Sequence, residues 1–277
     1  MFALRSMLRR VTVPAIAFAL VVAPLVPARA QNAELSADDI EEVRDFLIGN
    51  AISILFHETG HMLVTAYNLP VLGREEDAVD NLATLLLMDW DTDEGDQALI
   101  DSADAWFLSD VAGFDADQAP VYYGEHGLDR QRAYQIVCLM VGGKPDLYGD
   151  FADEVEMPKD RQQRCQIDYT TARESWDGVL YDYLLDEDAE PSAIFIHHDD
   201  APEALIYAKE ILEEESILED VADYVAGTFD LPFEVTYVAA KCDQANAFWN
   251  PADRIIVLCY ELIDFYADLI IKDITER

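Results

Sequence analysis

The stretch that decides the fold is FLIGNAISILFHETGHMLVTAYNLPVLGREEDAVDNLATLLL, residues 46–87, which places two histidines and several carboxylates among apolar residues. Apolar side chains recur at helical spacing over residues 40–67, so we predict a helix there, with a break or bend at Gly49-Asn50. A second helix is predicted over residues 75–88. Imidazoles and carboxylates in an apolar setting need polar partners or a metal ion, so this stretch is the first candidate for a functional site.

Within this stretch, residues 57–61 read His-Glu-Thr-Gly-His, an HExxH motif. Residues four apart lie on one face of a helix, so His57 and His61 can reach the same metal ion. Glu58 then lies beside that ion, where it can accept a proton from the attacking water. A catalytic zinc site needs a third protein ligand, because water takes the fourth position.

A second motif supplies the third ligand: Glu76 is followed four residues later by Asp80. HExxH followed by ExxxD on another helix resembles the gluzincins, the thermolysin-like zinc metallopeptidases. The resemblance implies that Glu58 is the general base and that Asp80 hydrogen-bonds the outer nitrogen of a histidine ligand. Glu75 is the alternative ligand, but only Glu76 lies four residues before Asp80. The resemblance further implies one Zn²⁺ per chain, bound by His57, His61 and Glu76.

Four longer segments together are similar to a bacterial exported family of candidate metallopeptidases: LPVLGREEDAVD, EHGLDRQRAYQIVCLMVGG, MPKDRQQRCQIDY and NAFWNPADRIIVLCYEL. This resemblance covers most of the chain and implies a zincin-like fold, but it names no substrate. In most zincins a sheet precedes the HExxH helix, and its edge strand aligns the substrate. Here the strand-like runs come last, so we interpret the chain as circularly permuted and expect its last helix near residues 36–50.

The rest of the chain predicts an α+β fold that is mostly helical, with a small sheet contributed by the C-terminal part. We expect residues 31–277 to form one metallopeptidase-like domain, with an internal linker near 186–193. The predicted elements are an acidic loop at 89–96, helices at 97–108, 128–141, 158–185 and 201–229, strands at 193–200, 233–240 and 254–262, a hairpin connection at 246–254 and a helical C-terminus.

The formal net charge is −38 and the pI is about 4.1, which argues against nucleic acid as a partner. Residues 1–30 combine a basic start, an apolar run and Ala-Arg-Ala before Gln31, the pattern of a cleaved signal peptide. An N-terminal membrane anchor is the alternative. We therefore expect an exported bacterial protein, periplasmic or secreted, with no stable membrane insertion after cleavage.

The four cysteines are Cys138, Cys165, Cys242 and Cys259. An even number of cysteines in an exported chain predicts two disulfides. Three connectivities are open, of which the pairing of sequence neighbours, 138–165 and 242–259, joins segments that look adjacent. Four buried thiols are the alternative.

Peptide hydrolysis also needs a donor for the oxyanion of the tetrahedral intermediate. His126 is the candidate, and four nearby residues are alternatives: Tyr122, Tyr123, Arg130 and Arg132. The competing interpretation is that Glu125 and His126 cap the following helix and the two arginines pair with carboxylates.

Other polar residues carry weaker signals. His197 and His198 are adjacent in a predicted strand and point to opposite faces, so we expect no shared metal. Glu261 could be a buried partner of a basic group. Three residues lie either at a cleft rim or in a hairpin packed on the core: Asn246, Phe248 and Trp249.

These observations favour zinc-dependent hydrolysis of peptide bonds outside the cytoplasm, with a peptide or protein as substrate. The alternative function is that of a non-catalytic, metal-stabilised binding or envelope-maintenance protein that retains the zincin fold. A metal-free scaffold would require the HExxH motif to be accidental.

Overall fold

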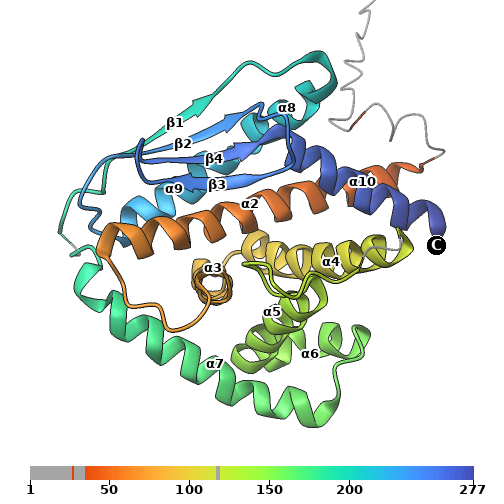
Figure 1. Cartoon of the computed structure of the whole chain (residues 1–277), viewed down its shortest axis with the longest axis horizontal. Coiled ribbons are helices and arrows are strands. Elements are labelled where there is room, and N and C mark those ends of the chain that lie inside the picture. Colours follow the sequence, from red (N-terminus) through yellow and green to blue (C-terminus); the bar gives the residue numbers. More distant parts are fainter. Residues whose placement is uncertain (1–26, 28–34, 117–118, 187) are drawn as a thin grey trace, which may run out of the picture.

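The computed structural model describes residue 27 and residues 35–116, 119–186 and 188–277. Helices dominate and one four-stranded sheet is formed by the C-terminal part, which confirms the predicted α+β class (Figure 1). No helix in these ranges is both long enough and apolar enough to cross a membrane. The helices are α2 (Ala37–Tyr67), α3 (Glu75–Trp90), α4 (Asp93–Asp115), α5 (Asp129–Gly143), α6 (Pro145–Glu154), α7 (Lys159–Leu180), α8 (Ile206–Glu214), α9 (Ile217–Thr228) and α10 (Tyr260–Glu276); the strands are β1 (Ile194–His198), β2 (Val235–Ala240), β3 (Ala247–Asn250) and β4 (Ile255–Cys259).

Helix α2 runs unbroken for 31 residues, so the predicted break at Gly49-Asn50 is wrong. Both residues instead allow α4 to pack closely against α2. A Cβ at Gly49 would overlap the Asp101 carboxylate. The side-chain amide of Asn50 donates to the carbonyl oxygens of Phe46, at 2.9 Å, and Asp101, at 3.3 Å. The sequence signals of a helix break thus mark a helix–helix contact.

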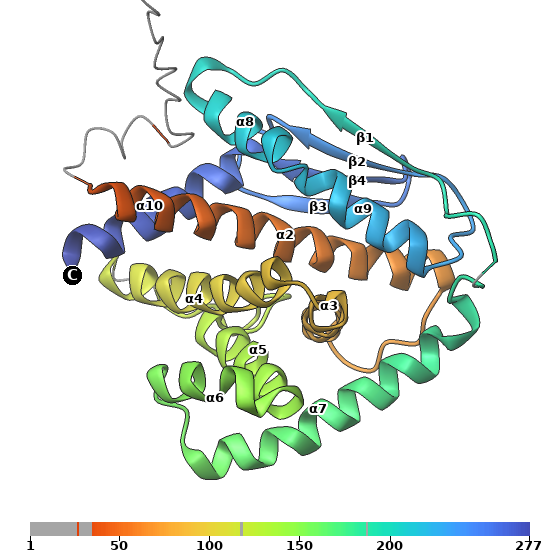
Figure 2. The same ribbon diagram turned by 180° about the vertical axis from the view of Figure 1, so that it is seen from behind.

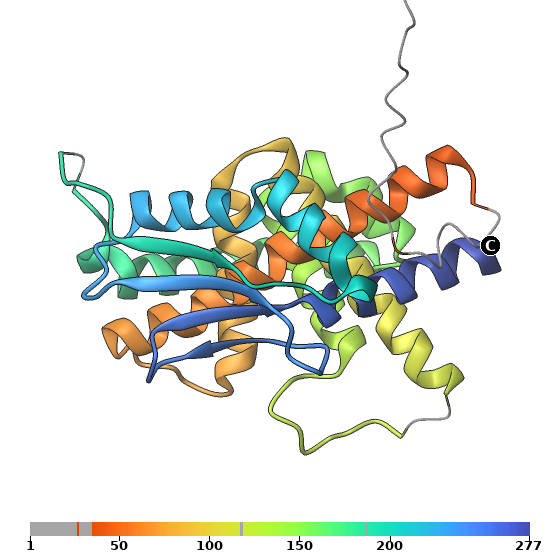
Figure 3. The same cartoon turned by 90° about the horizontal axis from the view of Figure 1, so that it is seen from above.

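Helix α2 lies between two layers, with the sheet on one side and helices α3 to α7 on the other (Figures 1 and 2). The strand order is β1-β2-β4-β3, and β1, β2 and β4 are parallel. Strand β3 is antiparallel to β4 and forms the edge of the sheet opposite β1, as the view from above shows (Figure 3). This edge packs against α2, which carries the HExxH motif.

Strand β3 corrects the expectation that residues 246–254 are only a hairpin connection. The turn is short because the side-chain oxygen of Asn250 accepts hydrogen bonds from the backbone N–H groups of Ala252 and Asp253. This local turn leaves residues 247–250 free to pair with β4.

Several element boundaries also differ from prediction. Helix α4 starts at Asp93, because the Thr92 hydroxyl caps it by accepting from the Gly95 N–H at 3.0 Å, so the acidic loop is much shorter than 89–96. Helix α6, which starts at Pro145, was not predicted. The predicted helix 201–229 is divided at Ser216, whose φ of 53° interrupts helical geometry. Helix α7 ends at Leu180 rather than near residue 185.

Two disulfides connect the elements, Cys138–Cys165 between α5 and α7, and Cys242–Cys259 at the end of β4. This is the pairing of sequence neighbours. As expected, the last helix lies against the start of α2. The rings of Phe46 and Tyr266 meet edge to face at 6.4 Å.

An acidic cavity of about 590 Å³ lies between α2, α4 and α10, beside Gly49. Its wall contains one arginine and eight carboxylates: Arg277 with Asp38, Glu41, Glu42, Asp45, Asp101, Asp104, Glu154 and Asp273. Asp101 is only 5% exposed, and its Oδ2 has no hydrogen-bond partner among the described residues. Burial, reinforced by Asp104, Asp45 and Glu42, raises the pKa of Asp101 to about 7.

This raised pKa predicts that part of the stability is lost as pH rises. The folded state keeps the Asp101 proton up to about pH 7, whereas the unfolded chain releases it near the ordinary pKa of 3.8. The contribution is therefore complete below about pH 4 and lost by about pH 7, with a size of roughly 1–4 kcal/mol. Urea unfolding at intervals from pH 4 to pH 8 should show Asp101→Asn gaining stability relative to wild type over that window.

Asp150→Asn is the matched control, because it removes the same charge from an exposed position. Its difference in unfolding free energy from wild type should stay nearly constant with pH. Parallel curves for Asp101→Asn and wild type would contradict the prediction.

Candidate metal centre

Three side chains from α2 and α3 converge on one point. His57 Nε2 lies 3.3 Å from Glu76 Oε2, and His61 Nε2 lies 3.4 Å from the same oxygen. The ligand atoms of all three residues lie within 4.8 Å of one another, so the group could hold a metal ion. Glu76 Oε2 is buried and has no hydrogen-bond partner of good geometry within the described part of the chain. A carboxylate oxygen that faces two imidazole nitrogens in this way fits a cation between them.

The local sequence explains why the two helices come close enough. A Cβ at Gly60 would lie 2.9 Å from the Cβ of Val79, so glycine on α2 lets α3 pack directly against the HExxH turn. Glu76 is in the first turn of α3, one helical turn before Val79, and therefore reaches the two histidines.

The outer nitrogen of each histidine faces its own carboxylate. His57 Nδ1 lies 2.8 Å from Asp80 Oδ1, and His61 Nδ1 lies 2.8 Å from Glu75 Oε1. If each Nδ1 carries the proton, both Nε2 atoms are left free for a metal ion. Glu75, the alternative ligand, thus contacts the outer nitrogen of His61, and Glu76 is the residue that meets both Nε2 atoms.

The electrostatics of the centre follow from burial and these contacts. Burial lowers the pKa of His57, but Asp80 and Glu76 outweigh it and raise that pKa to about 9. Burial raises the pKa of Glu76, yet the close imidazoles of His126, His57 and His61 hold it far below its usual value. Both shifts reflect the attraction between the imidazoles and the carboxylates, and the same carboxylates would attract a metal cation.

Glu58 lies between α2 and the edge of the sheet and is only 5% exposed. Burial raises the pKa of its carboxyl, His57 and His61 lower it, and the backbone N–H of Trp249 on β3 donates a hydrogen bond to it. Both Glu58 and His57 line a cavity of about 330 Å³. A buried carboxylate with a raised pKa, facing a cavity beside the candidate ligands, is suited to accept a proton.

The cavity has an apolar side and a polar side. Asn246 and Ala247 contribute the edge of the sheet, and His126 and Asp129 line it from the α4–α5 connection and the start of α5. Its apolar lining comes from three helices: Ile54 on α2, Ala105 and Trp106 on α4, and Leu262, Phe265 and Tyr266 on α10. Trp106 was not singled out in the sequence, which offers no motif that would distinguish it.

His126 lies at the centre, where it contacts the candidate ligand Glu76. Its Nε2 lies 2.8 Å from Glu76 Oε2, and its side chain is 49% exposed. Its ring stacks near that of His57, with centroids 6.5 Å apart. The role of oxyanion donor stays a prediction for His126.

The alternative oxyanion donors are either exposed or already paired with carboxylates. Tyr122 and Tyr123 are 80% and 92% exposed. Arg130 pairs with Asp110 at 2.7 Å, and Arg132 pairs with Asp80. The arginines thus pair with carboxylates, as the competing interpretation held.

The remaining polar candidates are outside the centre. Glu261 accepts hydrogen bonds from the backbone N–H groups of Cys242, at 3.0 Å, and Asp243, at 2.7 Å, so the expected basic partner is replaced by a loop backbone. His197 Nε2 lies 2.9 Å from Asp199 and is exposed, whereas His198 is nearly buried. The adjacent histidines therefore do not form a site together.

The geometry predicts which residues are required for metal. Purified protein supplied with zinc should hold about one ion per chain after dialysis. His57→Ala and Glu76→Ala should lose it, because each removes a ligand atom. Glu75→Ala should keep it with an affinity lower by roughly 10- to 100-fold, since it removes only the partner of His61 Nδ1. Elemental analysis and competition with a chromogenic chelator measure both quantities.

If Glu76→Ala keeps the metal and Glu75→Ala loses it, Glu75 is the third ligand and the assignment of Glu76 is wrong. Absence of bound metal from the wild type would contradict the site itself.

Comparison with known proteins agrees with this geometry. The model of the DUF4344 family, which is described as "Putative metallopeptidase", matches residues 23–180 and 198–277. No curated protein and no solved structure matches the chain. The match covers most of the sequence, including both motifs of the metal centre. The chain is therefore a member of the DUF4344 family of metallopeptidase-like proteins.

Proposed function

We propose that the protein is a zinc-dependent metallopeptidase that hydrolyses peptide bonds outside the cytoplasm. The observation that carries the proposal is the convergence of His57 Nε2, His61 Nε2 and Glu76 Oε2, with the buried carboxylate of Glu58 alongside. Membership of the metallopeptidase-like family supports hydrolysis of peptide bonds.

The donor set supports zinc as the metal. Two imidazole nitrogens and one carboxylate oxygen are a usual protein ligand set of catalytic zinc. With bonds of about 2.0–2.1 Å in tetrahedral geometry, neighbouring ligand atoms lie roughly 3.3 Å apart. The observed separations of 3.3 and 3.4 Å agree with that value. When bound, zinc would supply Lewis-acid chemistry, polarising the scissile carbonyl and making water more acidic.

Glu58 would move the protons of the reaction. Its carboxylate accepts a proton from the attacking water and later passes it to the leaving amine. The Trp249 N–H orients this carboxylate, and the raised pKa of Glu58 makes it a better proton acceptor than an exposed glutamate. Asp80 and Glu75 keep the two histidines in a fixed orientation through their Nδ1 atoms.

The edge of the sheet is suited to hold an extended peptide. In the antiparallel β3–β4 pair, alternate residues of β3 face β4, and the Asn246 carbonyl accepts from the Cys259 N–H at 3.1 Å. The backbone groups of the residues between them face away from β4, toward α2, as the Trp249 N–H does. A substrate strand could add where this edge lines the cavity, at Asn246 and Ala247, with its side chains against the apolar wall.

Two features support export. The disulfides Cys138–Cys165 and Cys242–Cys259 are typical of oxidising compartments. The sequence of residues 1–30 has the pattern of a signal peptide, although only residue 27 of that segment is among the described residues. We propose that residues 31–277 form the exported domain, periplasmic or secreted.

Replacing Glu58 with glutamine separates catalysis from metal binding. Glu58→Gln should retain about one zinc per chain and lose turnover of quenched-fluorescent peptides by about 10²- to 10⁴-fold, because glutamine cannot accept the proton. Glu219→Gln, a partly exposed glutamate on α9, is the matched control and should keep full turnover.

If the wild-type protein binds zinc but cleaves no peptide, the metal is structural and the proposed activity is contradicted. Unchanged turnover in Glu58→Gln would likewise exclude Glu58 as the base.

A further inference from the structure

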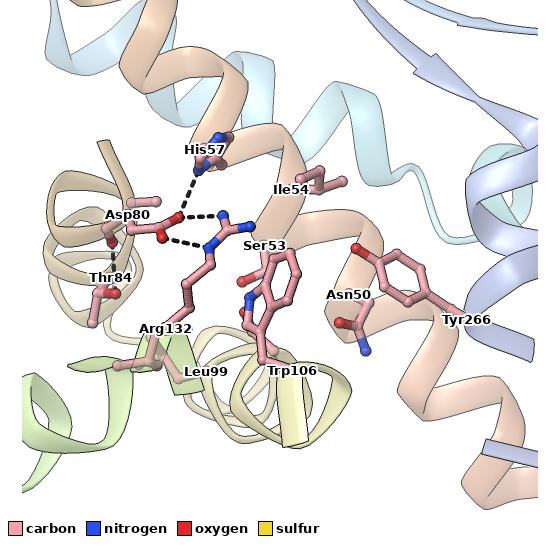
Figure 4. A pocket seen from close by; sticks show the side chains of 13 residues that line it. Asn50, Ser53, Ile54, His57, Asp80, Thr84, Leu99, Trp106, Arg132 and Tyr266 are labelled. Atoms are coloured by element: carbon pink, nitrogen blue, oxygen red, sulfur yellow. Dashed lines mark hydrogen bonds and ion pairs between the residues drawn. The ribbon is translucent and has the colours of Figure 1, made fainter. Parts of the chain in front are cut away.

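Arg132 lies behind the candidate metal centre and is only 7% exposed. Its guanidinium forms two hydrogen bonds with the Asp80 carboxylate, from Nε to Oδ2 at 2.7 Å and from Nη2 to Oδ1 at 2.7 Å (Figure 4). The face of the guanidinium lies over the Trp106 ring, whose centroid is 3.6 Å from the guanidinium carbon. Both the edge and the face of the guanidinium are therefore engaged.

Both oxygens of the Asp80 carboxylate are in turn engaged. Its Oδ1 faces His57 Nδ1 at 2.8 Å as well as Arg132 Nη2, and its Oδ2 accepts from Arg132 Nε. If the carboxylate rotated, it would lose contacts with both partners at once. The void beside these side chains is about 20 Å³, room for roughly one water molecule, so little space exists for another orientation.

We propose that Arg132 is a positioning residue for the metal centre. By holding the Asp80 carboxylate in one orientation, Arg132 fixes the His57 ring through its Nδ1 contact and presents Nε2 to the metal. Arginine is suited to this role because its planar fork matches both carboxylate oxygens, which the single ammonium of lysine cannot do. The inference rests on the proposed metal site and does not require peptide hydrolysis.

This arrangement links the centre to helices that supply no ligand. His57 is on α2, Asp80 on α3, Trp106 on α4 and Arg132 on α5, so four successive helices meet in one row of contacts. Trp106 also lines the cavity beside Glu58. The affinity for metal therefore depends on how α4 and α5 pack against α3.

The chain offers a matched control in Arg173. This arginine on α7 also forms a bidentate pair, through Nη1 and Nη2, with Asp89, which like Asp80 is on α3, at 2.5 and 2.7 Å. It also lies near an aromatic ring, that of Tyr169, at 5.8 Å. In the described part of the chain, the contacts of Arg173 do not include the candidate ligands, so its loss removes a similar pair without touching the centre.

The test compares full-length variants of the exported chain in zinc affinity and in the visible spectrum of the cobalt-substituted protein. Arg132→Met should weaken zinc binding by roughly 10- to 100-fold and change the cobalt spectrum, because His57 is no longer held. Arg132→Lys should recover only part of the affinity. Arg173→Met should remain within about threefold of wild type, even where both methionine variants lower the melting temperature.

A double-mutant cycle then asks whether Arg132 acts through Asp80. Asp80→Asn removes the charge that Arg132 compensates, so Arg132→Met should add little to the loss of zinc affinity already caused by Asp80→Asn. The double variant also leaves no unpaired charge at these two positions, which keeps the test valid if Arg132→Met alone fails to fold.

Three results would overturn the proposal: zinc affinity and cobalt spectrum unchanged in Arg132→Met, an equal loss of affinity in Arg173→Met, or additive losses in the cycle. Zinc binding that responds to Arg132 in a protein without peptidase activity would contradict the proposed function and leave this inference standing. Intact peptidase activity with an unaltered zinc affinity in Arg132→Met would contradict this inference alone.

Discussion

The buried contact between His57 and Asp80 is the interaction on which the centre depends. An ionised carboxylate on α3 costs free energy in a protein interior unless cationic or hydrogen-bonding groups surround it. His57 from α2 and Arg132 from α5 supply those groups, so the same contact that fixes a candidate ligand also joins three helices. Replacing His57 or Asp80 should therefore affect both the stability of the fold and the binding of metal.

Close approach of helices is the second condition. Gly60 allows α3 to pack against the HExxH turn of α2. Gly49, nearer the start of the same helix, allows α4 to pack against it. Because α2 is continuous, these two contacts and the edge of the sheet are held in fixed relation to one another. The candidate base Glu58 thus faces strand β3 on one side of α2, while the candidate ligands face α3.

The excess of negative charge has different consequences in different places. At the metal centre, carboxylates are paired with imidazoles or a guanidinium, and this pairing lowers the pKa of Glu76 and of Asp80. In the cavity between α2, α4 and α10, carboxylates face mainly one another, and the pKa of Asp101 rises instead. The direction of each shift is decided by neighbours that are distant in sequence.

The sequence by itself determined the mostly helical α+β class, the late sheet, the metallopeptidase-like family and the motifs of the centre, because helical periodicity and HExxH spacing are local properties of the chain. It misjudged Gly49-Asn50 and residues 247–250, whose conformations depend on α4 and on β4. Only the tertiary structure decided that Arg132 pairs with Asp80, that Trp249 contacts Glu58 and that Glu75 faces the outer nitrogen of His61. These contacts join residues from separate elements, and no local pattern specifies which side chains the packing of those elements will bring together.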